Sequence, residues 1–287
     1  MSTKVVEARS VTRRFGSFTA VDEVTMDVAP GEVVGLLGAN GAGKTTLMRM
    51  LLGLLPTTEG TVLMLGGPPR RERRRRLGYV PQNLGLYRDL TLTENLAFVA
   101  DAYGTPVPAL PDDLSRYADV LVADIPLGAQ RQGAFVAALS HEPEAVLLDE
   151  PTSGVDALAR ATLWDTIREQ ADRGVGVLIT THYMQEAQQC DRLLLMSQGR
   201  LVAQGSEADI VGSTRALVVR TDDWAAAFSA LNDAGAAVIL DGRTVRVADA
   251  GRDEIARILG AAHVDASVEP VPATIEERML VLAHQAR

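Results

Sequence analysis

A glycine-rich stretch near the start of the sequence has the residue types and spacing of a phosphate-binding loop. It matches the pattern G-x-x-x-x-G-K-[ST] at four positions, which are Gly38, Gly43, Lys44 and Thr45. The apolar run at 32–37 before the stretch predicts a buried strand, and the pattern at 46–52 after it predicts an amphipathic helix. This strand-loop-helix order is the context in which the motif is specific. The stretch therefore predicts a nucleotide site.

The residue types in this loop suit the tail of a nucleoside triphosphate. Glycines let the main chain wrap closely around phosphate oxygens, and the N-terminus of the following helix adds partial positive charge. We expect Lys44 to neutralise the β- and γ-phosphates and the Thr45 hydroxyl to ligate Mg²⁺. The expected ligands are thus ATP and Mg²⁺. The predicted nucleotide-binding residues of the loop are Gly38, Asn40, Gly41, Gly43, Lys44, Thr45 and Thr46.

Two carboxylates follow a second apolar run, at residues 145–148. Continuous apolar runs of this length are typical of parallel strands that are covered on both faces. Ligands of parallel sheets bind at the carboxyl ends of the strands, which places Asp149 and Glu150 beside the phosphate loop. Asp149 suits the coordination of Mg²⁺, and Glu150 suits a general base or water-positioning group. Together with the loop, the pair predicts hydrolysis of the nucleotide.

Composition limits the class of protein. A length of 287 residues favours about two domains, and 47% hydrophobic residues with few aromatics fits a globular α/β protein. A net charge of −9 argues against nucleic acid as the main partner. No apolar run reaches the length of a membrane span or has the features of a signal peptide, and the single cysteine is Cys190, so we expect a cytoplasmic protein.

The pattern of predicted elements changes near Gly212. Before it, strands and helices alternate, and residues 1–212 are predicted to form one α/β domain. After it, the order strand-helix-strand-strand-helix-strand predicts a small ferredoxin-like α+β unit over 213–287. Helical patterns occupy 90–121, where three prolines interrupt them, and 133–139. The arginine-rich run at 70–76 suits anionic lipid headgroups or an acidic partner, but the acidic chain favours the interpretation as a solvated helix face.

The motifs together resemble the nucleotide-binding subunit of an ABC transporter. They occur in the order of that family: the phosphate loop, Tyr79-Val80-Pro81-Gln82, the run from Leu148 to Asp156, and Thr180-Thr181-His182. The resemblance implies a P-loop ATPase fold with a mixed sheet and a helical subdomain at about 83–140. It also implies roles for residues outside the loop. Gln82 senses Mg²⁺ and water, Asp156 crosses a dimer interface, His182 contacts the γ-phosphate, and Phe15 stacks on adenine. Catalysis is thereby assigned to Glu150, His182 and Gln82.

The run from Thr180 to Ala187, followed by Cys190-Asp191-Arg192, and the C-terminal extension are similar to the ATP-binding proteins of bacterial exporters of drugs and other amphiphiles. By that resemblance the chain is a cytoplasmic subunit, peripheral at the inner face of the membrane, which drives a separate transmembrane permease and pairs with a second ATPase subunit. The rival classes are a regulatory subunit with weak turnover and a soluble ABC-type ATPase that acts on DNA or ribosomes. The acidic charge and the lack of a second ATPase half or a long insertion weigh against the last of these.

One motif departs from the family pattern. Counting back from Asp149 without gaps, the signature Leu-Ser-Gly-Gly-Gln falls on Ile125-Pro126-Leu127-Gly128-Ala129. Pro126 offers neither a hydroxyl nor an N–H to a phosphate, and Leu127 puts a branched side chain where glycine allows close approach. In the family the signature of one subunit closes on the ATP of the other. Two hypotheses follow: a heterodimer with one degenerate site, which we slightly prefer, or a homodimer that hydrolyses ATP slowly.

Overall fold

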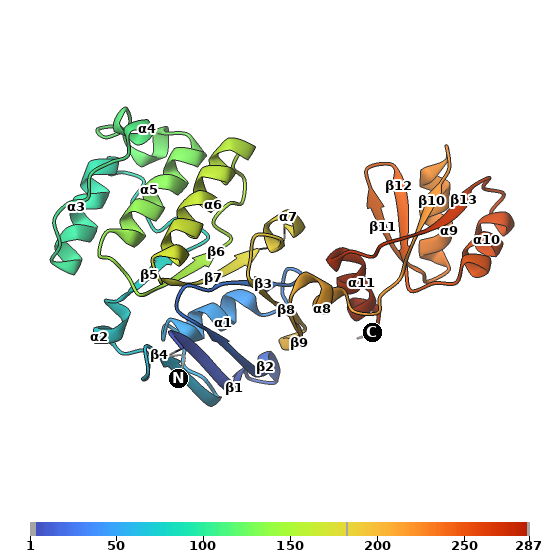
Figure 1. Ribbon diagram of the computed structural model, residues 1–287, viewed down its shortest axis with the longest axis horizontal. Helices are drawn as coiled ribbons and strands as arrows, with labels where there is room; N and C mark the ends of the chain where they lie inside the picture. Colours follow the sequence, from blue (N-terminus) through green and yellow to red (C-terminus); the bar gives the residue numbers. More distant parts are fainter. Residues whose placement is uncertain (1–3, 182, 286–287) are drawn as a thin grey trace. The chain divides into compact units, whose positions relative to one another are not determined.

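The computed structural model describes residues 4–181 and 183–285 (Figure 1). The chain divides into two compact units, residues 1–202 and 203–287. This division falls within strand β9, ahead of residue 212, where the sequence changes character. The short helix α8 (Glu207–Val211) therefore belongs to the second unit.

A six-stranded sheet forms the centre of the first unit. Its first five strands pair in parallel, which is why their sequences are continuous apolar runs. In β6, Ala145 and Leu147 pack toward one face of the sheet while Val146 and Leu148 pack toward the other. The strand order is β5 (Leu77–Val80), β6 (Ala145–Asp149), β7 (Gly176–Thr181), β3 (Val33–Leu37), β8 (Arg192–Ser197) and β9 (Arg200–Gly205).

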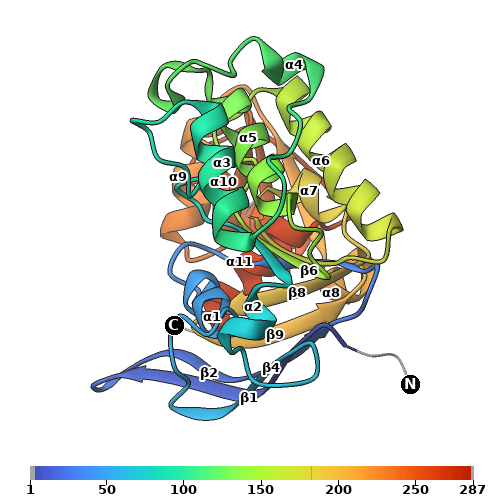
Figure 2. The ribbon, with the colours of Figure 1, turned by 90° about the vertical axis from the view of Figure 1, so that its left-hand side faces the viewer.

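A second, antiparallel sheet lies across one face of this unit. Its order is β2 (Phe18–Val28), β1 (Val6–Phe15) and β4 (Glu59–Met64). Helix α1 (Lys44–Leu51) runs between the two sheets, as Figures 1 and 2 show, and buries Leu47, Met48 and Leu51 in their shared core. Because α1 begins at the end of the glycine-rich loop, this packing fixes the position of that loop.

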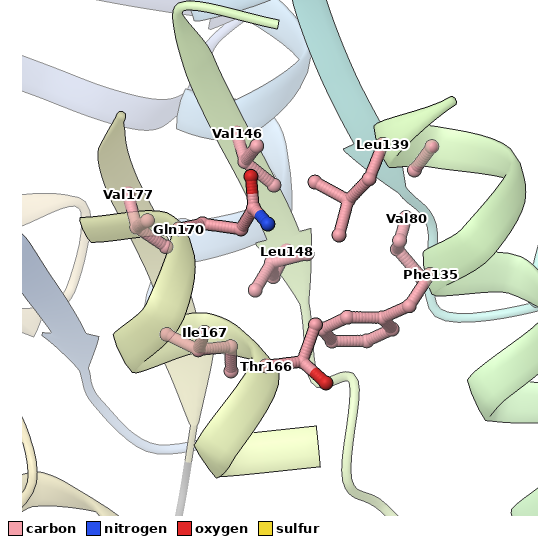
Figure 3. Close-up of a pocket in the computed structure, with 10 residues that line it drawn as sticks. Val80, Phe135, Leu139, Val146, Leu148, Thr166, Ile167, Gln170 and Val177 are labelled. Atoms are coloured by element: carbon pink, nitrogen blue, oxygen red, sulfur yellow. The ribbon is translucent and has the colours of Figure 1, made fainter. Parts of the chain in front are cut away.

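Two long helices cover the other face of the central sheet. They are α5 (Leu127–Leu139) and α6 (Ala157–Asp172), and Trp164 of α6 is the largest side chain fully buried there. Figure 3 shows the small gap between them and the sheet, whose lining is apolar except for Thr166 and Gln170. Its chemistry does not suit a phosphate-bearing ligand. The remaining helical segments of the unit are α2 (Arg71–Arg74), α3 (Leu92–Tyr103), α4 (Asp112–Ser115), η1 (Val122–Asp124) and α7 (Met184–Ala187).

Helix α3 is shorter than the helical pattern at 90–121 predicts. It begins with a capping box, in which the Thr91 hydroxyl accepts from the Glu94 N–H and the Glu94 carboxylate accepts from the Thr91 N–H. It ends at Gly104, which adopts a left-handed conformation with φ 71°. Residues 105–111, which contain the three prolines, are not helical, in agreement with the predicted interruption, and helix returns only in α4.

The arginine-rich run has local structural partners. Arg74 donates to the carbonyls of Gly53 and Pro69, Arg75 donates to the carbonyl of Tyr103, and Arg76 pairs with Glu144. These contacts join neighbouring segments of the first unit. They give three arginines of the run partners within the protein, which weighs against the lipid-binding interpretation.

None of the helices within residues 4–181 and 183–285 is both long enough and apolar enough to cross a membrane.

The second unit is a four-stranded antiparallel sheet with three longer helices. The chain order is β10 (Ala216–Arg220), α9 (Trp224–Asp233), β11 (Ala237–Asp241), β12 (Thr244–Ala248), α10 (Arg252–Ala261), β13 (Ser267–Val271) and α11 (Ile275–Gln285). The strand order in space is β11-β12-β10-β13. Val245 and Val247 of β12 share a core cluster with Leu231 of α9 and Leu259 of α10, so both of these helices cover the same face.

A buried ion pair attaches α11 to the opposite face of this sheet. Arg246 lies between Val245 and Val247 and therefore points away from α9 and α10. Its guanidinium pairs with Glu277, a fully buried residue of α11 that also accepts from the N–H and the hydroxyl of Thr274. Burial opposes ionisation of Glu277, but these hydrogen bonds outweigh it and lower the pKa of the carboxyl.

We expect Glu277→Gln to lower the free energy of unfolding by about 1–3 kcal/mol near neutral pH, because it replaces a charge-assisted hydrogen bond with weaker ones. The pKa of Glu277 is lowered in the folded state. Its ionised form therefore stabilises the fold above the unfolded pKa of about 4.3, and this contribution disappears as the pH falls through the lower folded pKa. Urea unfolding from pH 3 to pH 7 measures the difference, with the exposed Glu254→Gln as control. The prediction would be contradicted if the difference in the free energy of unfolding between Glu277→Gln and the unsubstituted protein did not decrease toward acid pH.

Candidate functional site

The phosphate loop connects β3 to α1 and depends on glycine at three positions. Gly38, Gly41 and Gly43 have φ values of 153°, 82° and 101°, a region that favours glycine. A Cβ on Gly38 would lie 2.5 Å from the carbonyl oxygen of Met196, and one on Gly43 would lie 2.5 Å from that of Ala20. A Cβ on Gly41 would meet no described atom within 4 Å. Two glycines thus allow the loop to pack against the protein, and the third keeps its outer side open.

Lys44 lies across the mouth of this loop. Its Nζ donates to the carbonyl of Gly38 at 2.6 Å and to that of Ala39 at 3.2 Å, and the residue is only 6% exposed. Burial lowers the pKa of the ammonium group, while the charges of Glu150 and Asp149 partly oppose that shift. Among the described residues, the acceptors of this buried cation are neutral carbonyls, so it is suited to receiving an anion.

A pocket forms in front of the loop. Residues 40–46 line one side of it, and Phe18, Ala20, Gln82 and Glu150 complete the lining. The structure thus brings the predicted loop residues together with Gln82 and Glu150, which lie far away in the sequence. Phe15, expected to stack on adenine, is not among the lining residues. Its ring lies 4.5 Å from the guanidinium of Arg13, whereas Phe18 on the adjacent strand lines the pocket.

The two carboxylates lie at the carboxyl end of β6, as predicted. Asp149 is buried and accepts a hydrogen bond of 2.7 Å from the Thr180 hydroxyl. Glu150 adopts a left-handed conformation with φ 50°, and its N–H donates to the same Thr180 hydroxyl at 2.9 Å. The Gln82 side chain donates to Glu150 Oε2 at 3.2 Å. Thr180 therefore fixes the main chain between the two acids, while Gln82 contacts the second acid from the pocket side.

A buried carboxylate behind the strand ends was not predicted. Glu186 of α7 is 1% exposed and accepts hydrogen bonds from the hydroxyls of Thr152 and Thr181. Arg160 of α6 lies 3.7 Å from it. Thr152 is two residues beyond Glu150, and Thr181 is the last residue of β7. Glu186 therefore joins the segment that follows the acidic pair to the end of β7. His182, predicted to contact the γ-phosphate, lies outside the described residues.

The segment at the predicted signature position forms the start of α5. Pro126 precedes the helix, Ile125 and Ala129 are buried, and Leu127 is exposed. Leu127 Cδ2 lies 3.1 Å from where a Cβ on Gly154 would be. Asp156, predicted to cross a dimer interface, caps α6 by accepting from the N–H groups of Leu158 and Ala159 at 3.0 Å. The hydrogen bond from Ala159 is the largest cause that lowers the pKa of Asp156.

Metal ligands do not cluster in the part of the chain that the structure describes, where no group of three or more His, Cys, Asp and Glu side chains could hold an ion. The predicted Mg²⁺ ligands are of another kind. The Thr45 hydroxyl and the Gln82 amide belong to residues that line the pocket, and Asp149 lies at the end of the adjoining strand. This set of oxygen donors suits a cation that keeps several of its waters and also binds phosphate oxygens.

Comparison with known proteins identifies the family. The ABC transporter family matches residues 21–153. The Nod factor export ATP-binding protein I of Paraburkholderia xenovorans is 39% identical over 226 residues, which are 74% of this chain and 74% of that protein. The chain belongs to the ABC transporter ATP-binding proteins. The residues that match the family include both the phosphate loop and the acidic pair.

Two further matches support the assignment of this ABC protein. The probable multidrug ABC transporter ATP-binding protein YbhF of Escherichia coli is 40% identical over 218 residues, which are 72% of this chain and 38% of YbhF. The chain therefore spans well under half the length of that relative. A solved structure of an ATP-binding subunit of an ABC transporter is 29% identical, with a TM-score of 0.65, and the match covers 72% of this chain and 92% of that one. These matches confirm the predicted P-loop ABC ATPase fold.

We expect Glu186→Ala to lower the free energy of unfolding by about 2–4 kcal/mol, because two buried hydroxyls lose their shared acceptor. Urea unfolding followed by circular dichroism measures the change. Glu169→Ala, an exposed position on α6, is the matched control, and it should change the free energy by no more than about 0.5 kcal/mol. Equal stabilities of the two variants would show that the Glu186 contacts do not stabilise this part of the protein.

Proposed function

We propose that the chain binds and hydrolyses ATP as a subunit of a bacterial exporter and thereby drives transport through a separate membrane protein. The observation that carries the proposal is the pocket, in which loop residues 40–46 face Gln82 and Glu150. A triphosphate bound along this loop would contact Lys44 and would lie near Glu150, which can activate water. Binding alone would not require Glu150 and Gln82 at the same pocket.

The nucleotide would be held by the main-chain N–H groups of the loop and by Lys44, Thr45 and Thr46. Thr45, Gln82 and Asp149 would hold Mg²⁺, which when bound neutralises charge on the phosphate oxygens. Glu150 would accept a proton from water or orient it, and Gln82 would position Glu150. We retain His182 as the expected contact of the γ-phosphate. For adenine stacking, Phe18 joins Phe15 as a candidate because it lines the pocket.

The partners follow from the same proposal. The chain would dock on a transmembrane permease at the inner face of the cell membrane and would pair with a second ATPase subunit. Names of relatives mention multidrug export and Nod factor export, which supports drugs or other amphiphiles as the cargo class. We further infer that residues 213–287 form the expected ferredoxin-like accessory domain. Support comes from the strand order β11-β12-β10-β13 and from two helices that cover one face of the sheet.

The altered signature favours a second candidate function, a degenerate or regulatory ATPase subunit. Pro126 cannot donate an N–H at the start of α5, and Leu127 packs toward Gly154 where the family pattern has small residues. A subunit of this kind would bind ATP but would complete its partner's site poorly. In a heterodimer the result would be one competent site and one degenerate site, and in a homodimer it would be slow hydrolysis.

Lys44→Ala should weaken Mg-ATP binding by roughly 100-fold, because it removes the charge-assisted contacts to phosphate. Titration with a fluorescent ATP analogue measures the affinity. Lys4→Ala is a matched control, since Lys4 and Lys44 are the only lysines in the sequence and Lys4 pairs with Asp27 at 3.1 Å. Unchanged affinity in Lys44→Ala, or equal losses in both variants, would refute the assigned role of the loop.

Glu150→Gln should lower the rate of ATP hydrolysis by about 100-fold while leaving Mg-ATP affinity within about threefold. The substitution removes the proton acceptor but leaves the phosphate loop and Lys44 unchanged. Phosphate release from the purified chain, alone and with a candidate partner subunit, measures the rate. Glu169→Gln on the exposed face of α6 is the control. Fast hydrolysis by the chain alone, abolished by Glu150→Gln, would exclude the degenerate-subunit candidate. Hydrolysis that survives the substitution would exclude Glu150 as the acting group.

A further inference from the structure

Arg131 is a buried residue near the pocket, and the proposed function assigns it no role. Arg131 belongs to the second turn of α5 and is 5% exposed. Burial lowers the pKa of its guanidinium, and the negative charge of Glu150 partly offsets this. A charged group in such a place has a large desolvation cost, which its contacts must offset.

The guanidinium of Arg131 holds two main-chain oxygens from different segments. Nη1 donates to the carbonyl of Gln82 at 3.2 Å, and Nη2 donates to the carbonyl of Ser153 at 3.3 Å. These segments are separated in the sequence by about seventy residues and are both part of the pocket region. The planar fork of an arginine can hold two acceptors in a fixed relative position, which a lysine ammonium cannot do.

Each of these segments is also tied to Glu150. The Ser153 N–H donates to the carbonyl of Glu150 at 3.2 Å. The Gln82 side chain donates to Glu150 Oε2, also at 3.2 Å. Arg131 thus holds the main chain on both sides of the Gln82–Glu150 hydrogen bond. Because α5 begins at the altered signature segment, Arg131 also connects that segment to the acidic group.

The energetics argue against a purely stabilising role. Glu150 acts on Arg131 through its charge, and within residues 4–181 and 183–285 the Nε of Arg131 has no hydrogen-bond partner. Buried ionic groups are costly to desolvate, so the burial of Arg131 is weak evidence for a stabilising role. We therefore expect a substitution of Arg131 by lysine or by an apolar residue to act mainly on the relative position of the two carbonyls. Its effect on the free energy of unfolding would be secondary.

We propose that Arg131 is a positioning residue for ATP hydrolysis, which fixes the main chain of Gln82 and Ser153 so that the Gln82 amide holds the Glu150 carboxylate in the pocket. This inference rests on the proposed ATPase function. Arg131 acts through Gln82 and Glu150 and does not itself touch the nucleotide. Movement of the start of α5, where the signature segment lies, is thereby transmitted to the alignment of Glu150.

The test compares three variants of the full chain by steady-state ATP hydrolysis. Arg131→Lys keeps the charge but loses the fork, and it should lower kcat by about 10-fold while KM for ATP stays within about twofold. Arg131→Ala should lower kcat by about as much. Free guanidinium ion at roughly millimolar concentration should then raise the kcat of this variant several-fold, because it can occupy the place of the missing side-chain group. Arg74→Ala is the matched control, because Arg74 also bridges two carbonyls, those of Gly53 and Pro69, away from the pocket.

A double-mutant cycle separates positioning from general destabilisation. In the unsubstituted chain, Gln82→Ala should lower kcat by about 10-fold, but in the Arg131→Lys background the same change should cost less than about twofold, because both residues act on the same carboxylate. Independent structural effects would instead add. Thermal unfolding of each variant shows whether the protein is folded in the assay.

The outcomes distinguish this inference from the function on which it rests. If the unsubstituted chain binds and hydrolyses Mg-ATP while Arg131→Lys has the same kcat, the positioning role is refuted and the ATPase function stands. A kcat loss that is additive with Gln82→Ala, or that Arg74→Ala reproduces, also refutes it. If the unsubstituted chain does not hydrolyse ATP with any partner, the proposed function fails and the inference fails with it.

Discussion

The site depends on the register of three neighbouring parallel strands. In this register Leu37 of β3 pairs with Thr181 of β7, and Asp149 of β6 pairs with Thr180 of β7. The carboxyl ends of β3, β7 and β6 therefore lie level with one another, so that the phosphate loop, the end of β7 and the acidic pair meet at one edge. A shift by one residue would reverse the faces on which these side chains lie and would separate Thr180 from Asp149. Burial of both sheet faces by apolar side chains holds this register.

Features carried by local sequence could be predicted. The strand at 145–148 with Asp149 and Glu150 after it, the glycine-rich loop and the helix that begins there all depend on neighbouring residues, and the structure confirms these elements. The helical pattern at 90–121 was only partly right. Capping at Thr91 and a left-handed glycine at Gly104 fix the ends of the helix more sharply than apolar spacing does.

Contacts between distant segments could not be predicted. Arg131 has no role in the sequence-based prediction, and its contacts with Gln82 and Ser153 depend on how α5 packs against two loops. Glu186 looked like an ordinary residue of a short helix, yet it is buried between two threonines. Phe15 and Phe18 are chemically equivalent in the sequence and pair directly across β1 and β2, and only the lining of the pocket shows that Phe18 reaches it. A buried charge has no sequence signature, because burial is a property of the packed chain.

The carbonyls that hold Lys44 have a consequence for ligand choice. In the structure, the Lys44 ammonium has the carbonyls of Gly38 and Ala39 as acceptors. A ligand gains at this position only by offering Lys44 a better acceptor than a neutral carbonyl, and anionic oxygens do so while hydroxyls do not. The loop should therefore discriminate by the length of the phosphate chain. Adenosine gains nothing from Lys44, and a monophosphate whose anion stops short of the ammonium gains little. Only nucleotides whose outer phosphates extend along the whole loop realise the full benefit.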